Sequence, residues 1–158
     1  MIFVSVGTHM ANFNRLIKEV DILAEQGILK DVVAQTGYAQ YIPEHIKYKN
    51  FFDELEMFDL IKRSEFLIVH GGGGIIYKGL KANKKIIVVP RLKRYNEHIN
   101  DHQLDLTTFL EARGKILAVY DIKSLETAIK KIKEFSPTKN KKTKNKIAGV
   151  INEFIRKN

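Results

Sequence analysis

Phe66-Leu67-Ile68-Val69-His70-Gly71-Gly72-Gly73-Gly74-Ile75 lies near the middle of the 158-residue chain and joins four apolar residues to four glycines. The apolar residues are consecutive and do not alternate with polar ones, which is typical of a strand covered on both faces. Glycines tolerate the backbone angles of a sharp turn. We therefore expect a buried strand, a tight glycine turn and a helix that begins near Ile75.

Similar apolar runs recur on both sides of this stretch, at residues 2–6, 32–34, 86–89 and 116–119. Segments of helical period separate them. One follows Asn12, a good N-cap, and another spans residues 53–63 with Leu55, Phe58 and Ile61 on one side. Two more apolar stripes are Leu125, Ile129 and Ile132, and Ile147, Val150, Ile151, Phe154 and Ile155. This alternation predicts an α/β fold, a Rossmann-like doubly wound parallel sheet.

Size and composition fit one globular domain with a tail. The chain is 44% hydrophobic and 28% charged, and it has no cysteine, which excludes disulfides and thiolate chemistry. The longest apolar runs are far shorter than the roughly 20 residues of a membrane span. The start of the chain lacks the features of a secretory signal. We expect a cytoplasmic protein with a folded domain over residues 1–135 and a basic linker with an amphipathic helix over residues 136–158.

The formal charge of +9 is concentrated at the C-terminal end. Residues 130–158 hold ten Lys or Arg and two Glu, a net of +8, so residues 1–129 carry only +1. Such a segment suits a solvated linker, an anionic membrane surface or a nucleic acid. The Lys/Asn run at 139–146 has no interleaved aromatic residue for base stacking, which argues against a nucleic-acid partner.

Polar and glycine residues follow four of the expected strands. Ligands of doubly wound sheets bind beyond the carboxyl ends of the strands, so these residues should converge on one edge. They are Gly7-Thr8-His9, Gln35-Thr36-Gly37, the run from His70 to Gly74, and the loop from Arg91 to Gln103.

The four glycines are the best phosphate-binding candidate at that edge. Glycines allow an anion to approach the backbone, and the next helix offers free N–H groups. The run is neither a Walker A loop nor a Rossmann G-x-G-x-x-G motif. A plain strand-to-helix turn is the alternative, but four glycines exceed what a turn needs.

Residues 97–103, Glu-His-Ile-Asn-Asp-His-Gln, allow three interpretations. His98 and His102 are four residues apart, as metal-binding histidines on a helix are, although the zincin order is absent. Asn100, Asp101 and Gln103 suit hydrogen bonds to sugar hydroxyls equally well. A solvated helix start capped by Asn96 or Asn100 is the third.

Six motifs together resemble one family closely. They are residues 2–9, 13–17, 35–38, 69–72, 88–91 and 97–103, in the family's order along residues 1–125. The family comprises the donor-binding subunits of two-component glycosyltransferases, related to the C-terminal half of glycosyltransferase family 28. The resemblance is strongest to the branch that builds bacterial capsule and exopolysaccharide.

The resemblance implies the C-terminal half of a GT-B enzyme, without a metal or other cofactor. It implies transfer, with inversion, of a hexose (galactose, N-acetylglucosamine or glucuronic acid) from a UDP-sugar to a lipid-diphosphate-linked sugar. A membrane-associated partner would bind the acceptor. The base that deprotonates the acceptor hydroxyl would come mainly from this partner. The chain would then be peripheral at the inner face of the membrane.

Site residues follow from the same resemblance. Gly7, Thr8 and the run His70, Gly71, Gly72, Gly73 and Gly74 would hold the diphosphate. Gln35, Thr36 and Gly37 would lie near uracil, and Asp101 and Gln103 near the donor sugar. His9 is the best local candidate for a base. Arg91, Glu97, His98, Asn100 and His102 match the family pattern and complete the expected donor site.

Lys78 departs from the family pattern. Many relatives have Glu at this position, where it accepts hydrogen bonds from ribose hydroxyls, and a lysine has no acceptor. Lys78 could instead meet phosphate. The departure also motivates an alternative function, a non-catalytic nucleotide-binding regulatory subunit that stabilises a membrane-associated partner.

Overall fold

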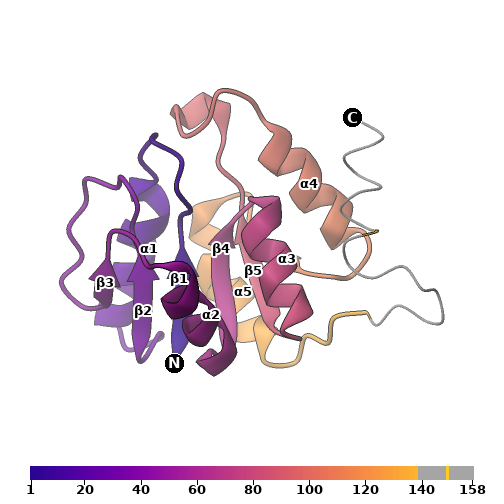
Figure 1. The fold of residues 1–158 in the computed structure, drawn as a ribbon, viewed down its shortest axis with the longest axis horizontal. Coiled ribbons are helices and arrows are strands. Elements are labelled where there is room, and N and C mark those ends of the chain that lie inside the picture. The colour runs from indigo at the N-terminus through magenta and orange to yellow at the C-terminus, as the bar shows by residue number, and fades with distance from the viewer. Residues whose placement is uncertain (139–148, 150–158) are drawn as a thin grey trace.

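Six parallel strands form a single sheet in the order β3-β2-β1-β4-β5-β6. The computed structural model describes residues 1–138 and residue 149, and Figure 1 shows this part of the chain in colour. The strands are β1 (Ile2–Ser5), β2 (Val32–Gln35), β3 (Lys47–Lys49), β4 (Phe66–His70), β5 (Lys85–Val89) and β6 (Leu117–Ala118). The expected doubly wound parallel sheet is confirmed.

Strand β3 was not predicted from the sequence. Its residues, Lys47, Tyr48 and Lys49, are all exposed because it is an edge strand that pairs only with β2. No apolar run marks such a strand, and it is held by backbone hydrogen bonds.

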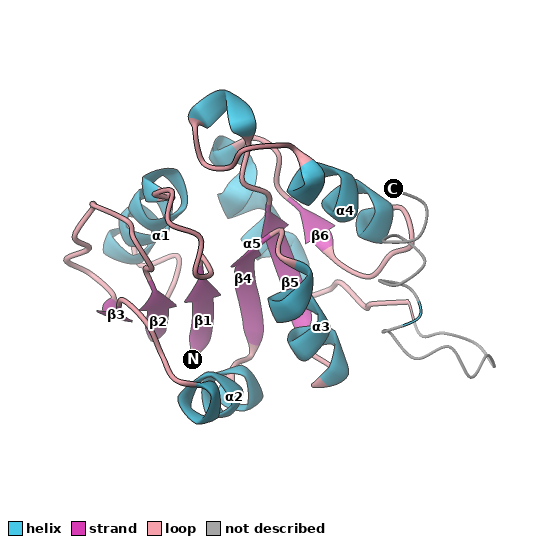
Figure 2. Ribbon diagram, turned by 45° about the horizontal axis from the view of Figure 1, so that its top comes forward, coloured by secondary structure: helices cyan, strands magenta, loops and turns pink. Residues whose placement is uncertain are grey.

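Helices cover both faces of the sheet, as Figure 2 shows. The helices α1 (Asn14–Glu25) and α5 (Leu125–Ile132) pack on one face, and α2 (Glu54–Arg63), α3 (Gly73–Lys81) and α4 (His102–Glu111) on the other. Consecutive strand residues point to opposite faces, so β1 gives Val4 to the first core and Phe3 to the second. This two-sided burial explains the unbroken apolar runs. Two short 3₁₀ turns, Lys93–Tyr95 and Ile122–Ser124, complete the described elements.

Two helix details differ from expectation. Phe13, and not Asn12, is the N-cap of α1, while the Asn12 Oδ1 accepts a hydrogen bond from the Asn14 N–H at 3.5 Å. In α2 only Ile61 of the expected apolar stripe is buried, and Leu55 and Phe58 are 81% and 51% exposed. Met57, Leu60 and Ile61 face the sheet instead, because they share a helix face that the strands cover.

The long segment between β2 and β3 is attached to α1 by a buried carboxylate. Asp21 accepts hydrogen bonds from the Tyr41 hydroxyl at 2.8 Å and from the N–H groups of Glu44 and His45 at 3.1 and 2.8 Å. Burial alone would raise the pKa of Asp21, but these hydrogen bonds lower it below its ordinary value. Asp21 therefore stabilises the segment as a carboxylate.

The expected C-terminal helix and most of the basic segment lie outside the described residues. The chain can be followed as far as Thr138, whose N–H donates to the Gly114 carbonyl at 2.8 Å. Among the described helices, none has the length and apolarity needed to cross a bilayer.

Candidate functional site: the carboxyl edge of β1 and β4

The direction in which successive strands are added to the sheet reverses between β1 and β4. From β1 the chain moves outward to β2 and β3, and it then returns to the other side of β1 as β4. The connections that leave β1 and β4 diverge to opposite faces, and in doubly wound sheets ligands bind at such a point. Residues 6–13 and 71–72 form these two connections. The polar residues that the sequence places after the strands thus meet at the topological switch point.

The ring of His70 lies between two glycines of these connections. A Cβ atom added to Gly7 would collide with the His70 Cε1, and one added to Gly72 would collide with the His70 Nε2. Gly7 also has a φ of +76°, which side-chain-bearing residues rarely adopt. The close approach of this ring requires both glycines, and the positive φ is a second reason for glycine at position 7 only.

His70 is a neutral imidazole at physiological pH. Burial lowers the pKa of His70 to about 4, with smaller contributions from the positive charge of Arg91 and from His98 and His9. Its Nδ1 lies 3.3 Å from the Ser5 carbonyl oxygen. Because that oxygen can only accept, Nδ1 carries the proton, and Nε2 keeps a lone pair.

The glycines after His70 open α3. Gly72 is the N-cap and offers no side-chain cap to the helix. The first-turn N–H groups of α3 therefore lack both an intrahelical partner and a capping side chain. A Cβ atom added to Gly71 would lie 2.8 Å from the Gln103 Cβ. A Cβ atom added to Gly74 would meet nothing within 4 Å. The helix start is open at Gly74 and closed at Gly71.

Arg91 is fully buried and binds the loops around it. Its guanidinium donates to the backbone carbonyls of Val6 at 2.8 Å, Ala11 at 2.9 Å, and Asn12 and Glu97 at 3.2 and 3.1 Å. Burial lowers the pKa of Arg91 to about 10, so it remains a cation at neutral pH. Its side chain is committed to these loops, and it does not face the open edge.

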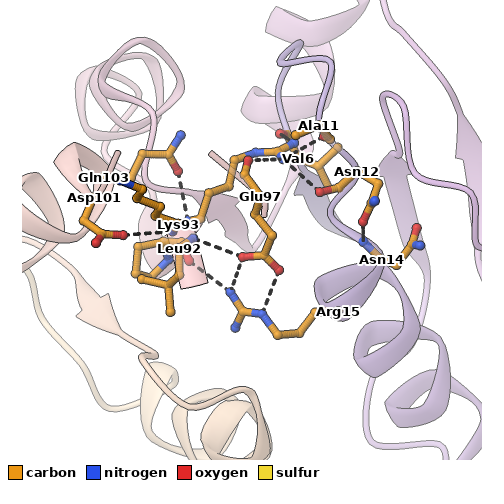
Figure 3. A network of polar contacts seen from close by, with 12 residues as sticks. Val6, Ala11, Asn12, Asn14, Arg15, Leu92, Lys93, Glu97, Asp101 and Gln103 are labelled. Atoms are coloured by element: carbon orange, nitrogen blue, oxygen red, sulfur yellow. Dashed lines mark hydrogen bonds and ion pairs between the residues drawn. The ribbon is translucent and has the colours of Figure 1, made fainter. Parts of the chain in front are cut away.

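Glu97 is likewise buried and forms a bidentate ion pair with Arg15 of α1. The two N···O distances are both 2.9 Å, and the Glu97 Oε2 also accepts from the Leu92 N–H at 3.1 Å. Figure 3 shows how this pair links the start of α1 to the loop after β5. Arg91 and Glu97 were both expected among the donor contacts, and the structure uses both to fix the loops that carry the site.

Two other histidines stack across these loops. The rings of His9 and His98 are 4.6 Å apart between centroids and 28° from parallel. His9 Nδ1 accepts a hydrogen bond from the Ala11 N–H at 3.2 Å, and His98 Nδ1 accepts one from the Asn100 N–H at 3.4 Å. Burial lowers the pKa of His9, and nearby His98 and Arg91 lower it further.

The residues after β2 are held by hydrogen bonds within the protein. The Gln35 amide donates to the Gly7 carbonyl at 3.2 Å and accepts from the Phe52 N–H at 3.2 Å. Thr36 donates through its hydroxyl to the Asn50 Oδ1 at 3.2 Å. Gly37 packs on Gly7, whose carbonyl oxygen would lie 2.9 Å from an added Cβ. Gln35 thus positions the Gly7 turn, and Gln35, Thr36 and Gly37 are all buried.

The segment from Asn100 to Gln103 forms the start of α4, with Asp101 as N-cap. The Asp101 Oδ1 accepts from the Lys93 N–H at 2.9 Å, and the Gln103 Oε1 accepts from the Arg91 N–H at 3.1 Å. Asn100 Oδ1 accepts from the His102 N–H at 3.2 Å. The exposed His102 faces Asp105 at 3.7 Å. His98 stacks on His9 and is not paired with His102, and residues 1–138 hold no cluster of three potential metal ligands.

Lys78 points toward α2 on the exposed side of α3. Its Nζ donates to the Glu54 Oε1 at 3.1 Å, and both side chains are largely exposed. The lysine that replaces the family's glutamate thus has a carboxylate partner on the neighbouring helix.

Sequence reasoning missed Arg15, Ser5 and Glu54 as parts of this site. Arg15 lies in one of the quoted motifs, in the first turn of α1, and that motif was the available signal. The contacts of Ser5 and Glu54 depend on how the strands and helices are placed relative to each other, which the sequence pattern does not specify.

Comparisons with known proteins agree with this architecture. The sequence profile of the glycosyltransferase family 28 C-terminal domain matches residues 1–155. No curated protein matches the chain.

Solved structures share the fold at low sequence identity. The glycosyltransferase of kitacinnamycin superposes with a TM-score of 0.63 at 17% identity, over 98% of this chain and 39% of the other. The UDP-GlcNAc 2-epimerase from Neisseria meningitidis, bound to UDP-GlcNAc, gives 0.59 at 12%, over 99% and 44%. The C-terminal CMP-Kdo binding domain of WaaA from Acinetobacter baumannii gives 0.55 at 9%, over 99% and 89%. The chain spans about two fifths of the first two and most of the third.

Proposed function

This chain belongs to the glycosyltransferase family 28 C-terminal domain family, and on that premise we propose that it is the donor-binding subunit of a two-component inverting glycosyltransferase. Its donor is a UDP-hexose. The observation that carries the proposal is the meeting of the Gly7 turn and the glycine-opened start of α3 at the switch point between β1 and β4.

The diphosphate lies at the start of α3. Uncapped first-turn N–H groups and the positive end of the helix dipole favour an anion there. Gly73 and Gly74 leave the amides accessible, and Gly7 and Thr8 approach from the end of β1. These groups would also stabilise the charge that develops on the leaving UDP.

The nucleoside and the sugar lie on either side of the diphosphate. Uracil lies near Gln35, Thr36 and Gly37, and Asp101 and Gln103 at the start of α4 contact the donor sugar. Support for this arrangement comes from the shared edge of these segments and from two of the similar folds, which are described with UDP-GlcNAc and with CMP-Kdo. The transfer proposed is of galactose, N-acetylglucosamine or glucuronic acid to a lipid-diphosphate-linked sugar of capsule or exopolysaccharide.

A membrane-associated subunit supplies the acceptor-binding half. Two large apolar side chains beside the stacked histidines support a partner at this edge, because Met10 and Ile99 are 78% and 77% exposed. The basic segment from residue 130 onward would add attraction to an anionic inner leaflet. The chain would then work in the cytoplasm, at the membrane surface.

The experiment is a turnover assay with a lipid-linked acceptor, run with this chain alone, the partner alone and both together. Catalysis needs both substrates held at near contact, so only the mixture should be active. A chelator should leave this activity unchanged. Efficient transfer by this chain alone would contradict the two-subunit proposal. UDP binding without any transfer in the mixture would favour the regulatory alternative that Lys78 motivated.

A further inference from the structure

Resting on the proposed function, we propose that His9 and His98 bind the diphosphate, each through its Nε2–H, and that neither accepts a proton during transfer. The proposal reassigns His9, which was expected as a base. It gives the two stacked rings one shared role in holding the anion between two loops.

The hydrogen bonds of the two rings fix where their protons are. A backbone N–H can only donate, so a ring nitrogen that faces one must present a lone pair. The Ala11 N–H faces the His9 Nδ1 at 3.2 Å, and the Asn100 N–H faces the His98 Nδ1 at 3.4 Å. Each neutral ring therefore carries its single proton on Nε2, at the edge away from its own backbone.

This arrangement leaves both rings as donors. Neither Nε2 has a hydrogen-bond partner among residues 1–138, and both rings are only partly buried. A ring whose Nδ1 lone pair is engaged and whose Nε2 is protonated has no free lone pair for the acceptor's proton. Two N–H donors on stacked rings, 4.6 Å apart between centroids, instead suit two oxygens of a diphosphate.

Groups from four elements or loops face the pair of rings. From β4 comes neutral His70, and from the end of β5 comes the buried cation of Arg91. On the pair's own loops, Glu97 is paired with Arg15, and the Asp101 Oδ1 is bonded to the Lys93 N–H. No free carboxylate in this set compensates a new imidazolium. Burial is the first cause of the lowered pKa of His9, and His98 and Arg91 lower it further.

The loops behind the rings are already fixed. Arg91 bonds to carbonyls on both sides, at Ala11 and at Glu97, and the Arg15–Glu97 pair ties the start of α1 to the second of these loops. The buried network already stabilises these loops, and the histidine stack adds little to that stability. Its contribution is the two outward donors, placed in advance of binding.

The test compares glutamine and asparagine at each histidine by calorimetric titration of the whole chain with UDP. Glutamine can place an amide N–H close to the position of Nε2, whereas asparagine can only mimic Nδ1. We expect H9N and H98N to weaken UDP binding by about tenfold or more, the loss of a hydrogen bond to a charged group. We expect H9Q and H98Q to recover most of that affinity, and H45N, on the β2–β3 segment, to serve as the unaffected control.

Other results would identify a different role. Equal losses in Gln and Asn variants, with a parent affinity that falls as the pH rises from 6 to 8, would indicate an imidazolium and overturn the proposal. Unchanged UDP binding in all four variants would also overturn it and restore His9 as a candidate base. No UDP binding by the parent chain would instead refute the proposed function itself.

A second measurement needs no variant. In the ¹⁵N-labelled chain, two-bond correlations to the imidazole nitrogens distinguish the Nε2–H tautomer, the Nδ1–H tautomer and the imidazolium. We expect the Nε2–H pattern for His9 and His98 and the Nδ1–H pattern for His70 at pH 7.5. The Nδ1–H pattern at His9 would contradict the proposal even if a substituted chain failed to fold.

Discussion

The imidazole of His70 occupies the space that a side chain at Gly72 would need, because a Cβ atom there would collide with the His70 Nε2. Any substitution at Gly72 therefore displaces the ring before it can obstruct a ligand. A loss of binding in such a variant would report the position of His70 and say little about the anion. Gly74, where a Cβ meets nothing within 4 Å, gives the cleaner test.

Two substitutions of Gly74 should have different effects: alanine should stabilise the fold, and valine should weaken UDP binding. Alanine at this helical position should raise the free energy of unfolding by about 0.5–1 kcal/mol, since glycine loses more backbone entropy on folding. The bulkier G74V should weaken UDP binding by roughly tenfold, about 1.4 kcal/mol, by crowding the first-turn N–H groups. Urea unfolding and calorimetry measure the two effects. UDP affinity equal to that of the parent in both variants would exclude the start of α3 as the diphosphate site.

The Arg15–Glu97 pair should be a major source of stability at the site. E97Q removes the charge and leaves the Arg15 guanidinium, only 15% exposed, without its counter-ion. Breaking a buried pair from one side costs about 3–5 kcal/mol. The matched control is D59N, which breaks the exposed Arg63–Asp59 pair and should cost less than about 1 kcal/mol. Equal denaturation midpoints for the two variants would contradict this role.

Asp21 should make the protein lose stability in acid. Its pKa is lower in the folded state than the ordinary value of 3.8, so its contribution is complete above that value and is lost as the pH falls through the folded pKa. D21N should be less stable than the parent at pH 7, by about 1–3 kcal/mol for the hydrogen bonds it disturbs. The difference should shrink below about pH 4. A parent–variant difference that is constant from pH 7 to pH 3 would show that ionisation of Asp21 does not contribute.

Lys78 should act on α2 more than on the donor. Its Nζ is 3.1 Å from Glu54, and exposed pairs contribute at most about 1 kcal/mol. We expect K78A and E54A to have similar small effects on stability and to change UDP affinity by less than about twofold, below 0.5 kcal/mol. If K78A weakens UDP binding while E54A strengthens it, Lys78 contacts phosphate directly.

The sequence predicts the layered fold well because unbroken apolar runs require strands with two covered faces. It does not predict β3, whose three residues are all exposed. It also misplaces Leu55 and Phe58, because the period of α2 allows more than one apolar face and only the sheet selects Met57, Leu60 and Ile61.

At the site, the sequence predicts which loops converge but not how each side chain is used. Arg91 and Glu97 follow a strand end, as donor contacts would, yet both are buried in a network with Arg15 and backbone carbonyls. The protonation pattern of His9, His70 and His98 depends on single backbone groups of Ala11, Ser5 and Asn100. Such contacts between loops are set by tertiary packing, and no local pattern encodes them.

The most direct measurement of the central claim is an NMR titration of the ¹⁵N-labelled chain with UDP. Glycine amides report from both edges of the sheet. Gly7 and Gly71 to Gly74 follow the carboxyl ends of strands, whereas Gly27 and Gly114 lie in the turns that precede β2 and β6. We predict saturable shifts at Gly7 and Gly71 to Gly74, with Gly27 and Gly114 unchanged. No saturable shift at the first group, or shifts confined to Gly27 and Gly114, would contradict donor binding at the β1–β4 switch point.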